Sequence, residues 1–289
     1  MTKEKKRIIF YSLLPLCIVI ILIYLIPVFN VIVNAFTGFT GSTKGEFVGL
    51  ANLAKIQSAI PKTIKTTLIW TLGSVIPAII IGLILALLLE KNFYLKKIFL
   101  ALNLLPYSIP LIIVASFWLF VLNQNFGILN GLLQQFGIIN EPIAFLNYKN
   151  SLTSVIIARI WRATPFAFIN FYAALTTIPM ELYEAACVDG ASPSQRFWKI
   201  TLPNLKSVLS TTLIVLTVWT FLVFDIIFGM TGGGPVDATR IISIQIYKEL
   251  FHMKDLGTAS MWSLIAIVVL TIITIIYWIL FERKGNTYD

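Results

Sequence analysis

The sequence is poor in charged residues, cysteine and histidine, and each shortage excludes a class of protein. Only 12% of its 289 residues are charged and 58% are hydrophobic, whereas a soluble domain carries about a quarter charged residues. This composition excludes a soluble globular enzyme, and the excess of apolar residues excludes a disordered chain. Two cysteines cannot form a disulfide framework. The single histidine, His252, has no His or Cys companion and predicts no metal site.

Two further absences concern phosphate and nucleic acid. The chain contains no Gly-Lys dipeptide, so it has no phosphate-binding P-loop. It has no Arg/Lys stripe with interleaved aromatics, so its net charge of +9 does not predict a nucleic-acid partner. No catalytic constellation is found either, because Glu181 and Glu184 have no nucleophile beside them. The chain is therefore predicted not to be an enzyme.

What the sequence does have is long apolar runs. A membrane-spanning helix needs about 20 largely apolar residues. Six runs meet this need and predict an all-α, multi-pass membrane protein with both termini on the same side. The predicted spans are 8–33, 66–89, 98–122, 151–175, 207–230 and 256–281, all within one domain, 1–289.

The distribution of Lys and Arg predicts which side faces the cytoplasm. With the N-terminus inside, the inner segments hold twelve Lys and Arg residues and the longer outer segments hold eight. The cluster Lys3–Arg7 before the first span is the strongest single determinant of orientation. Both termini are therefore predicted to be cytoplasmic. Within the third span, the two prolines of Leu105–Pro110 predict a kink.

The most informative stretch is Pro179–Pro203, within a predicted cytoplasmic loop at 176–206. Met180–Asp189 is a short helix of good helix formers, and Gly190 is a natural stop because glycine readily adopts the left-handed conformation. Ser192 is a predicted N-cap, with Pro193 at the first helical position of a second short helix. This pattern predicts an exposed helix–turn–helix elbow. Its charge of −1 favours docking on a partner over lying on the membrane, since surface-lying helices are rich in Lys and Arg.

At these residues the sequence resembles a known family, the permease subunits of binding-protein-dependent ABC importers. The shared pattern is EAA, three residues, Gly, nine residues, Ile, one residue and Leu-Pro. It falls on Glu184, Ala185, Ala186, Gly190, Ile200, Leu202 and Pro203. A longer form that adds Asp189, Ala191, Phe197 and Thr201 resembles the carbohydrate-uptake, maltose-type branch.

A second segment carries the same resemblance. Phe224-Asp225, Thr231–Pro235 and Ala238-Thr239 are similar to the residues that follow the fifth span in that branch. Gly232–Gly234 is not a phosphate cradle, since no Lys follows it, and it is expected to form a tight outer turn.

The resemblance implies a fold and a set of partners. It implies the type I importer permease fold, in the plasma (inner) membrane of a bacterium or archaeon. The partners implied are a second permease subunit, a dimer of ATP-binding cassette ATPases, an extracytoplasmic solute-binding protein and a sugar. ATP and Mg²⁺ would be held by the partner ATPase, and this chain would bind no cofactor itself. The EAA residues and Asp189 would couple the permease to the ATPase.

Three charged residues lie within predicted spans, where charges are costly and usually face a cavity or each other. They are Arg159, Arg162 and Asp225. One interpretation is an Arg–Asp pair that locks the fourth and fifth spans together. The other is a polar lining for a translocation path through the membrane, where these side chains bind the hydroxyls of a sugar. Trp161, Asn170 and Tyr172 are further candidates for contact with a sugar.

Two other classes of membrane protein fit the sequence less well than an importer. A stand-alone channel or secondary transporter needs no EAA loop and usually shows an internal repeat, which this sequence lacks. A purely structural membrane subunit, with no path of its own, is disfavoured because the fourth and fifth spans contain charged residues. Within the importer reading, glycerol phosphate or another polyol derivative is the alternative substrate.

Overall fold

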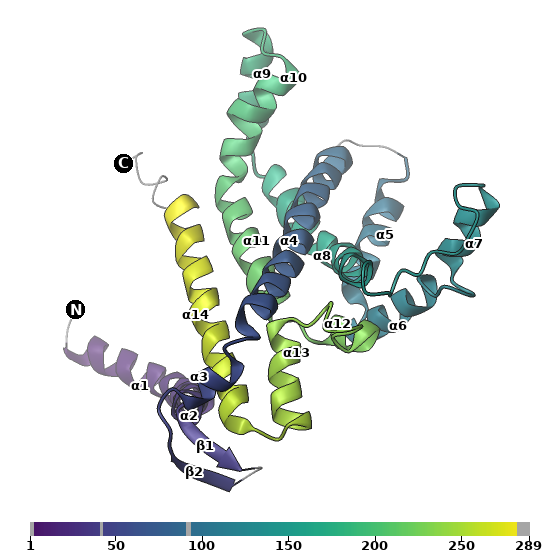
Figure 1. Ribbon diagram of the computed structural model, residues 1–289. Coiled ribbons are helices and arrows are strands. Elements are labelled where there is room, and N and C mark those ends of the chain that lie inside the picture. Colours follow the sequence, from purple (N-terminus) through teal and green to yellow (C-terminus); the bar gives the residue numbers. More distant parts are fainter. Residues whose placement is uncertain (1–2, 41–42, 91–93, 282–289) are drawn as a thin grey trace. The chain divides into compact units, whose positions relative to one another are not determined.

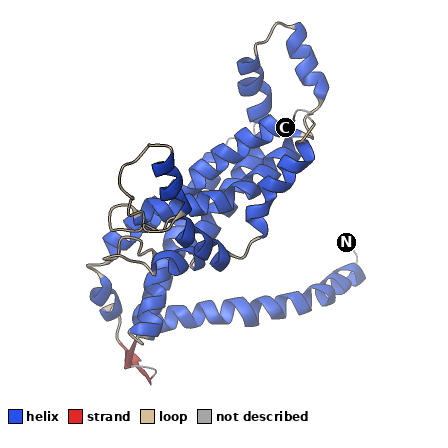
Figure 2. Cartoon of the chain, turned by 90° about the vertical axis from the view of Figure 1, so that its right-hand side faces the viewer, coloured by secondary structure: helices blue, strands red, loops and turns tan. Residues whose placement is uncertain are grey.

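The computed structural model describes residues 3–40, 43–90 and 94–281, and these are mostly helical (Figures 1 and 2). The described elements are α1 (Lys3–Ile20), η1 (Ile21–Leu25), α2 (Ile26–Ala35), β1 (Thr37–Thr40), β2 (Thr43–Phe47), α3 (Ala51–Ile56), α4 (Ile60–Glu90), α5 (Lys96–Ser108), α6 (Leu111–Val121), α7 (Ile128–Gln135), α8 (Ser151–Leu175), α9 (Met180–Val188), α10 (Pro193–Arg196), η2 (Phe197–Thr201), α11 (Leu202–Leu222), α12 (Asp225–Thr231), α13 (Ile242–Tyr247), η3 (Lys248–His252) and α14 (Leu256–Phe281). The η segments are π-helical. The predicted all-α fold is confirmed, with one short antiparallel hairpin, β1–β2, added to it.

Five helical runs are long and apolar enough to cross a membrane. They are 11–35, 60–89, 151–175, 193–222 and 256–280. A sixth candidate is the pair α5 and α6, which meet at an angle of 103°. With this pair counted as one span, the described residues contain six candidate spans, the same number as the apolar runs predicted but with different bounds.

The bend between α5 and α6 has a local cause. Pro106 lies inside α5, and Pro110 directly precedes α6. A residue before proline is pushed out of the helical region, and Ile109 accordingly has φ −83° and ψ 132°. The kink predicted at Leu105–Pro110 is thus confirmed, and it is sharp enough to divide the span into two helices.

The described residues form two compact units. The larger consists of the described residues within 62–244 and 270–281, and its core is built on α4, α6, α8, α11 and α12. Lipid is as apolar as leucine, so close van der Waals packing has to hold membrane helices together. Gly82 of α4 illustrates this, because a Cβ there would lie 2.7 Å from the Cβ of Ala167 in α8. Only glycine permits that approach.

The fifth predicted span, 207–230, is not one helix in the structure. The helix starts earlier, since α10, η2 and α11 run on from Pro193 to Leu222, with Pro203 in the first turn of α11. It also ends earlier, at Val223, whose backbone is extended with φ −62° and ψ 133°. The freed carbonyl of Val223 accepts a hydrogen bond from Ser243 Oγ at 3.0 Å. The separate helix α12 then begins at Asp225 and ends at Gly232, which is left-handed as the glycine turn predicted.

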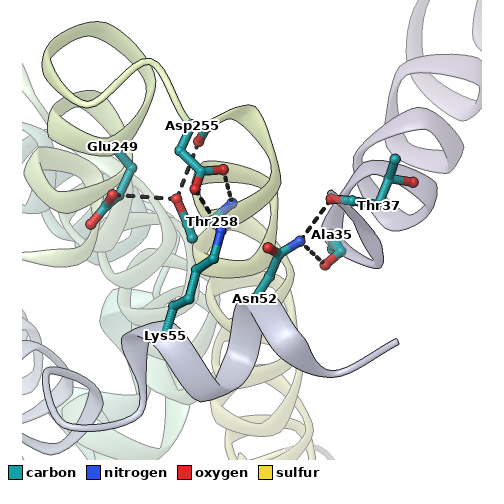
Figure 3. A network of polar contacts seen from close by, with 7 residues as sticks. All are labelled: Ala35, Thr37, Asn52, Lys55, Glu249, Asp255 and Thr258. Carbon is teal, nitrogen blue, oxygen red and sulfur yellow. Dashed lines mark hydrogen bonds and ion pairs between the residues drawn. The ribbon is translucent and has the colours of Figure 1, made fainter. Parts of the chain in front are cut away.

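The smaller unit consists of the described residues within 3–61 and 245–269 and contains the hairpin and a polar network (Figure 3). The buried Asn52 of α3 donates through Nδ2 to the carbonyls of Ala35 at 2.9 Å and Thr37 at 2.8 Å. Lys55, one turn later, donates to Asp255 Oδ2 at 3.0 Å. These contacts join residues that are far apart in sequence, so α3 ties the start of the hairpin to the start of α14.

Asp255 has two roles in this network. Its Oδ1 accepts from the backbone N–H of Thr258 at 3.1 Å, so it is the N-cap of α14, and its Oδ2 pairs with Lys55. Partial burial acts to raise the pKa of Asp255, but the hydrogen bonds from Thr258 and Lys55 outweigh it and hold this pKa below its ordinary value. The ionised form is therefore the one that stabilises this unit.

We expect Asp255→Ala to lower the free energy of unfolding at neutral pH by about 1 kcal/mol, the scale of one N-cap plus an exposed ion pair. Asp255→Asn should lose less, because asparagine still caps the helix. A carboxylate whose pKa is lowered by folding contributes its full stabilisation of the folded state at pH values above its unfolded-state pKa. That stabilisation is lost as the pH falls through its folded-state pKa. Thermal unfolding in detergent at pH 7 and at pH 3 should therefore show a difference in unfolding temperature between wild type and Asp255→Ala that is smaller at pH 3.

Glu141→Gln, at an exposed carboxylate outside the network, is the matched control. An unchanged unfolding temperature for Asp255→Ala at pH 7 would contradict the network's role.

Candidate functional sites: an exposed elbow and a charged cavity

The first candidate site is the elbow formed by α9, α10 and η2. The loop geometry follows the sequence prediction: α9 ends at Val188, and Gly190 adopts a left-handed φ of +75°. The backbone N–H of Ala191 then donates to the carbonyl of Ala186 at 2.8 Å, which closes the helix end. Figure 1 shows the elbow at one end of the α11 ribbon.

The second arm of the elbow is fixed by a capping box. Ser192 Oγ accepts from the backbone N–H of Gln195 at 3.3 Å, and Gln195 Oε1 accepts from the backbone N–H of Ser192 at 2.7 Å. Two contacts cross between the arms. The hydroxyls of Tyr183 and Thr201 are 2.9 Å apart, and Arg196 Nη1 lies 2.8 Å from Cys187 Sγ. The turn is thus held on both sides and presents a fixed shape.

The outer surface of the elbow is open. No residue of α9 is buried, and Glu184, Ala185, Asp189 and Pro203 are exposed. The inner side encloses a hollow of about 400 Å³. Its lining comes from Ala186, Asp189, Gly190, Ala191, Gln195, Arg196, Lys199 and Ile200. Most of the predicted EAA residues therefore lie on one exposed structure, whereas Ile200 and Leu202 are half-buried at its base.

The second candidate site is a cavity of about 370 Å³ in the larger unit. It gathers all three charged residues that the sequence placed within spans: Arg159 and Arg162 on α8, and Asp225 at the start of α12. The remaining walls come from α5, α6, α8, α11 and the residues after α11, namely Tyr107, Leu111, Ala163, Phe166, Leu216, Trp219, Leu222, Val223 and Phe224. The bend at Pro110 matters here, because Tyr107 precedes it and Leu111 follows it.

The hydrogen bonds of Arg159 bear on the first of the two interpretations, in which an arginine pairs with Asp225. Arg159 Nε and Nη2 donate to Thr220 Oγ1, at 3.1 and 2.9 Å. Among the described residues no ion pair joins Asp225 to either arginine. The reason is the break at Val223, after which Asp225 starts a new helix and lies exposed. Spans four and five are joined, but by a hydroxyl and not by a carboxylate.

Thr220 links three helices at one residue. Its hydroxyl accepts from Arg159 of α8, and its carbonyl accepts from Trp70 Nε1 of α4 at 2.9 Å. Trp70 and Thr220 are fully buried, and Arg159 is 5% exposed. The sequence reasoning missed Thr220, because a threonine in an apolar run has no pattern of its own.

The other predicted sugar contacts do not line this cavity. Trp161 stacks on Phe117, with ring centroids 5.7 Å apart, and packs beside the core. Asn170 donates to the carbonyl of Phe166 at 2.9 Å, within its own helix. Tyr172 stacks on Phe168, with centroids 5.5 Å apart. Three of the six predicted residues are thus gathered in the cavity, and three are held elsewhere by packing or by backbone bonds.

Comparison with known proteins identifies the family. Residues 78–284 match the profile of the binding-protein-dependent transport system inner membrane component. A trehalose/maltose transport system permease protein, MalF, of Thermococcus litoralis is 34% identical, over 93% of this chain and 91% of the relative. An sn-glycerol-3-phosphate transport system permease protein, UgpA, of Agrobacterium fabrum is 31% identical, over 83% and 82%. The chain belongs to this permease family.

The permease also shares its fold with a solved importer. A chain from the bacterial alginate ABC transporter, in complex with an alginate pentasaccharide-bound periplasmic protein, superposes with a TM-score of 0.85. The match covers 98% of this permease and 97% of that chain at 22% identity, a likeness of fold alone. The family, predicted from the EAA pattern, is confirmed, and with it a multi-pass inner-membrane protein that is a transport subunit and not an ATPase.

We expect Thr220→Val to destabilise the permease by about 1–3 kcal/mol, because it leaves buried guanidinium N–H groups without an acceptor. Thr220→Ser keeps the hydroxyl and should retain most of the stability. Thr211→Val is the matched control on the same helix, since Thr211 is exposed and its hydroxyl, among the described residues, donates only to the carbonyl of Ser207. Thermal unfolding of the assembled complex in detergent measures all three. Equal unfolding temperatures for Thr220→Val and Thr211→Val would contradict the role given to Thr220.

Asp225→Ala should behave differently, changing the unfolding temperature little. Removing one partner of a buried ion pair costs about 3–5 kcal/mol, but Asp225 is exposed and forms no such pair among the described residues. A double-mutant cycle of Asp225→Ala with Arg159→Ala should give a coupling energy within error of zero. A coupling above about 1 kcal/mol would instead support the interpretation in which Asp225 pairs with Arg159.

Proposed function

We propose that this permease forms half of the translocation path of an ATP-driven importer for a sugar or sugar derivative. An extracytoplasmic binding protein delivers the solute, a second permease subunit completes the path, and two partner ATPases hold ATP and Mg²⁺. The observation that carries the proposal is the family match over 78–284. This range includes the elbow and all residues that line the charged cavity. Relatives named for trehalose/maltose, sn-glycerol-3-phosphate and sulfoquinovosyl glycerol support a carbohydrate or polyol solute.

We assign to the elbow the role of binding the partner ATPase. The charge distribution predicts it to be cytoplasmic, and its rigid turn suits a transmitted motion. It also exposes apolar side chains, with Val188 88% and Trp198 63% exposed. Exposed apolar groups on an ordered surface favour a protein partner that covers them. Glu184 and Asp189 add acidic contacts beside them.

The cavity is the part we assign to the solute. Charged residues within membrane spans usually face a substrate path or a water-filled cavity. Here two arginines, an aspartate and the rings of Tyr107, Phe166 and Trp219 surround one hollow. Polar groups that converge in an aromatic-walled cavity of a few hundred Å³ are typical of small-molecule sites.

Glycerol phosphate or another polyol derivative remains the alternative solute, since UgpA is among the relatives. Family membership argues against a stand-alone channel or secondary transporter.

Gly190→Val tests the coupling role. Nothing lies within 4 Å of a Cβ at Gly190, so the variant makes no clash, but its φ of +75° disfavours a β-branched residue by about 1–2 kcal/mol. The turn should relax and misaim α9 while the spans stay intact. We expect normal membrane insertion, with ATP-driven solute uptake into proteoliposomes reduced several-fold relative to ATP hydrolysis.

Gly137→Val is the matched control. Gly137 has φ +65° and equally open surroundings, so it imposes the same backbone strain outside the elbow. It should leave the ratio of uptake to hydrolysis unchanged. If Gly190→Val transports at the wild-type ratio in the assembled complex, the coupling role of the elbow is wrong. If the wild-type complex takes up no sugar or polyol with any binding protein, the importer proposal itself is wrong.

A further inference from the structure

The formal charges that line the cavity do not balance. Arg159 and Arg162 contribute two positive charges, and Asp225 contributes one negative charge. Among the described residues no other ionisable carboxylate lines it, and neither arginine has a carboxylate within ion-pair distance. The cavity therefore carries a net charge of +1 within a membrane-spanning bundle, where an unbalanced charge is costly.

The neighbours of the two guanidinium groups do not supply the missing charge. Arg159 binds Thr220, which is neutral and accepts from only two of its N–H groups. Arg162 lies over the ring of Tyr107, with its guanidinium carbon 4.5 Å from the ring centroid. Its Nε is buried and has no hydrogen-bond partner. Both side chains are thus oriented by neutral groups and keep donors for something that enters the cavity.

We infer that this cavity receives a solute with a single negative charge, such as a uronic acid or another sugar acid. A planar guanidinium matches a carboxylate, because two parallel N–H groups can donate to its two oxygens. One negative charge brings the cavity to neutrality, whereas a neutral sugar leaves it at +1. A phosphate ester carries between one and two negative charges at pH 7 and would overcompensate it. This inference rests on the proposed function and adds the charge of the solute, which relatives named for trehalose/maltose and for sn-glycerol-3-phosphate leave open.

The walls fit the remainder of such a molecule. Phe166 and Trp219 lie with ring centroids 4.9 Å apart, and Tyr107 is 6.1 Å from Phe166, so these three lining residues form one aromatic cluster. Aromatic rings pack against the C–H face of a sugar, and the volume of about 370 Å³ lies in the range of small-molecule cavities. The geometry combines a charged end for the carboxylate with an apolar wall for the ring.

Ligand-induced thermal stabilisation of the detergent-solubilised complex, with both permeases and both ATPases but without the binding protein, tests this directly. The probes are sodium D-glucuronate, D-glucose and glucose 6-phosphate, at equal ionic strength and pH 8. We expect glucuronate to raise the unfolding temperature more than the other two. Arg162→Gln should weaken glucuronate binding about tenfold, the scale of one charge-assisted hydrogen bond, and Arg162→Lys should retain part of it.

Two further variants separate a charge effect from damage to the fold. Asp225→Asn raises the cavity charge to +2 and should move the preference from glucuronate toward glucose 6-phosphate. Lys149→Gln removes one positive charge at an exposed position outside the cavity and should leave the preference unchanged. A preference that moves in opposite directions in Arg162→Gln and Asp225→Asn cannot come from a loosened core.

Equal or larger stabilisation by glucose in the wild-type complex would overturn the inference, as would an unchanged preference in Arg162→Gln. Either result would mean that the missing negative charge comes from outside this chain, for example from the second permease. That failure is distinguishable from failure of the importer proposal, because ATP-driven uptake and its dependence on Gly190 would persist.

Discussion

The bond between Arg159 and Thr220 is the constraint on which much of this permease depends. A guanidinium inside a membrane helix must find acceptors within the protein, since lipid offers none. The hydroxyl of Thr220 accepts two of its N–H groups, and the carbonyl of the same residue accepts from Trp70. Helices α4, α8 and α11 therefore meet at one polar point. Packing is otherwise non-directional among apolar side chains, so this point fixes how the three helices are rotated about their axes.

Two interruptions of helical structure give the cavity its shape. The proline pair at Pro106 and Pro110 turns α6 away from α5 by 103°, and the extended Val223 separates α12 from α11. Both breaks leave backbone groups that must be satisfied at membrane depth. At Val223 the hydroxyl of Ser243 does so. The same breaks place Tyr107 and Asp225 on the cavity wall, so the irregular backbone coincides with the charged hollow.

The elbow combines rigidity with exposure. The left-handed Gly190, the capping box of Ser192 and Gln195, and the contact between Tyr183 and Thr201 all fix the angle between its two arms. None of these contacts buries α9. A structure held by local hydrogen bonds can remain exposed until a partner covers it. Since η2 passes into α11 without a break, a force applied to the elbow would act on the helix that carries Thr220.

The sequence by itself determined the membrane class, the number of apolar spans, the kink at Leu105–Pro110 and the shape of the elbow. These features depend on local chemistry: hydropathy over about 20 residues, proline sterics, and the capping preferences of glycine and serine. The spacing of the EAA pattern also determined the family. Only the tertiary structure decided which polar groups meet. In it Arg159 bonds to Thr220 and not to Asp225, Arg162 lies over Tyr107, and the cavity lining does not include Trp161, Asn170 or Tyr172. A hydroxyl in an apolar run carries no periodic signal, and a contact between Thr220 and Arg159 spans 61 residues, so its formation depends on how α8 and α11 are rotated against each other.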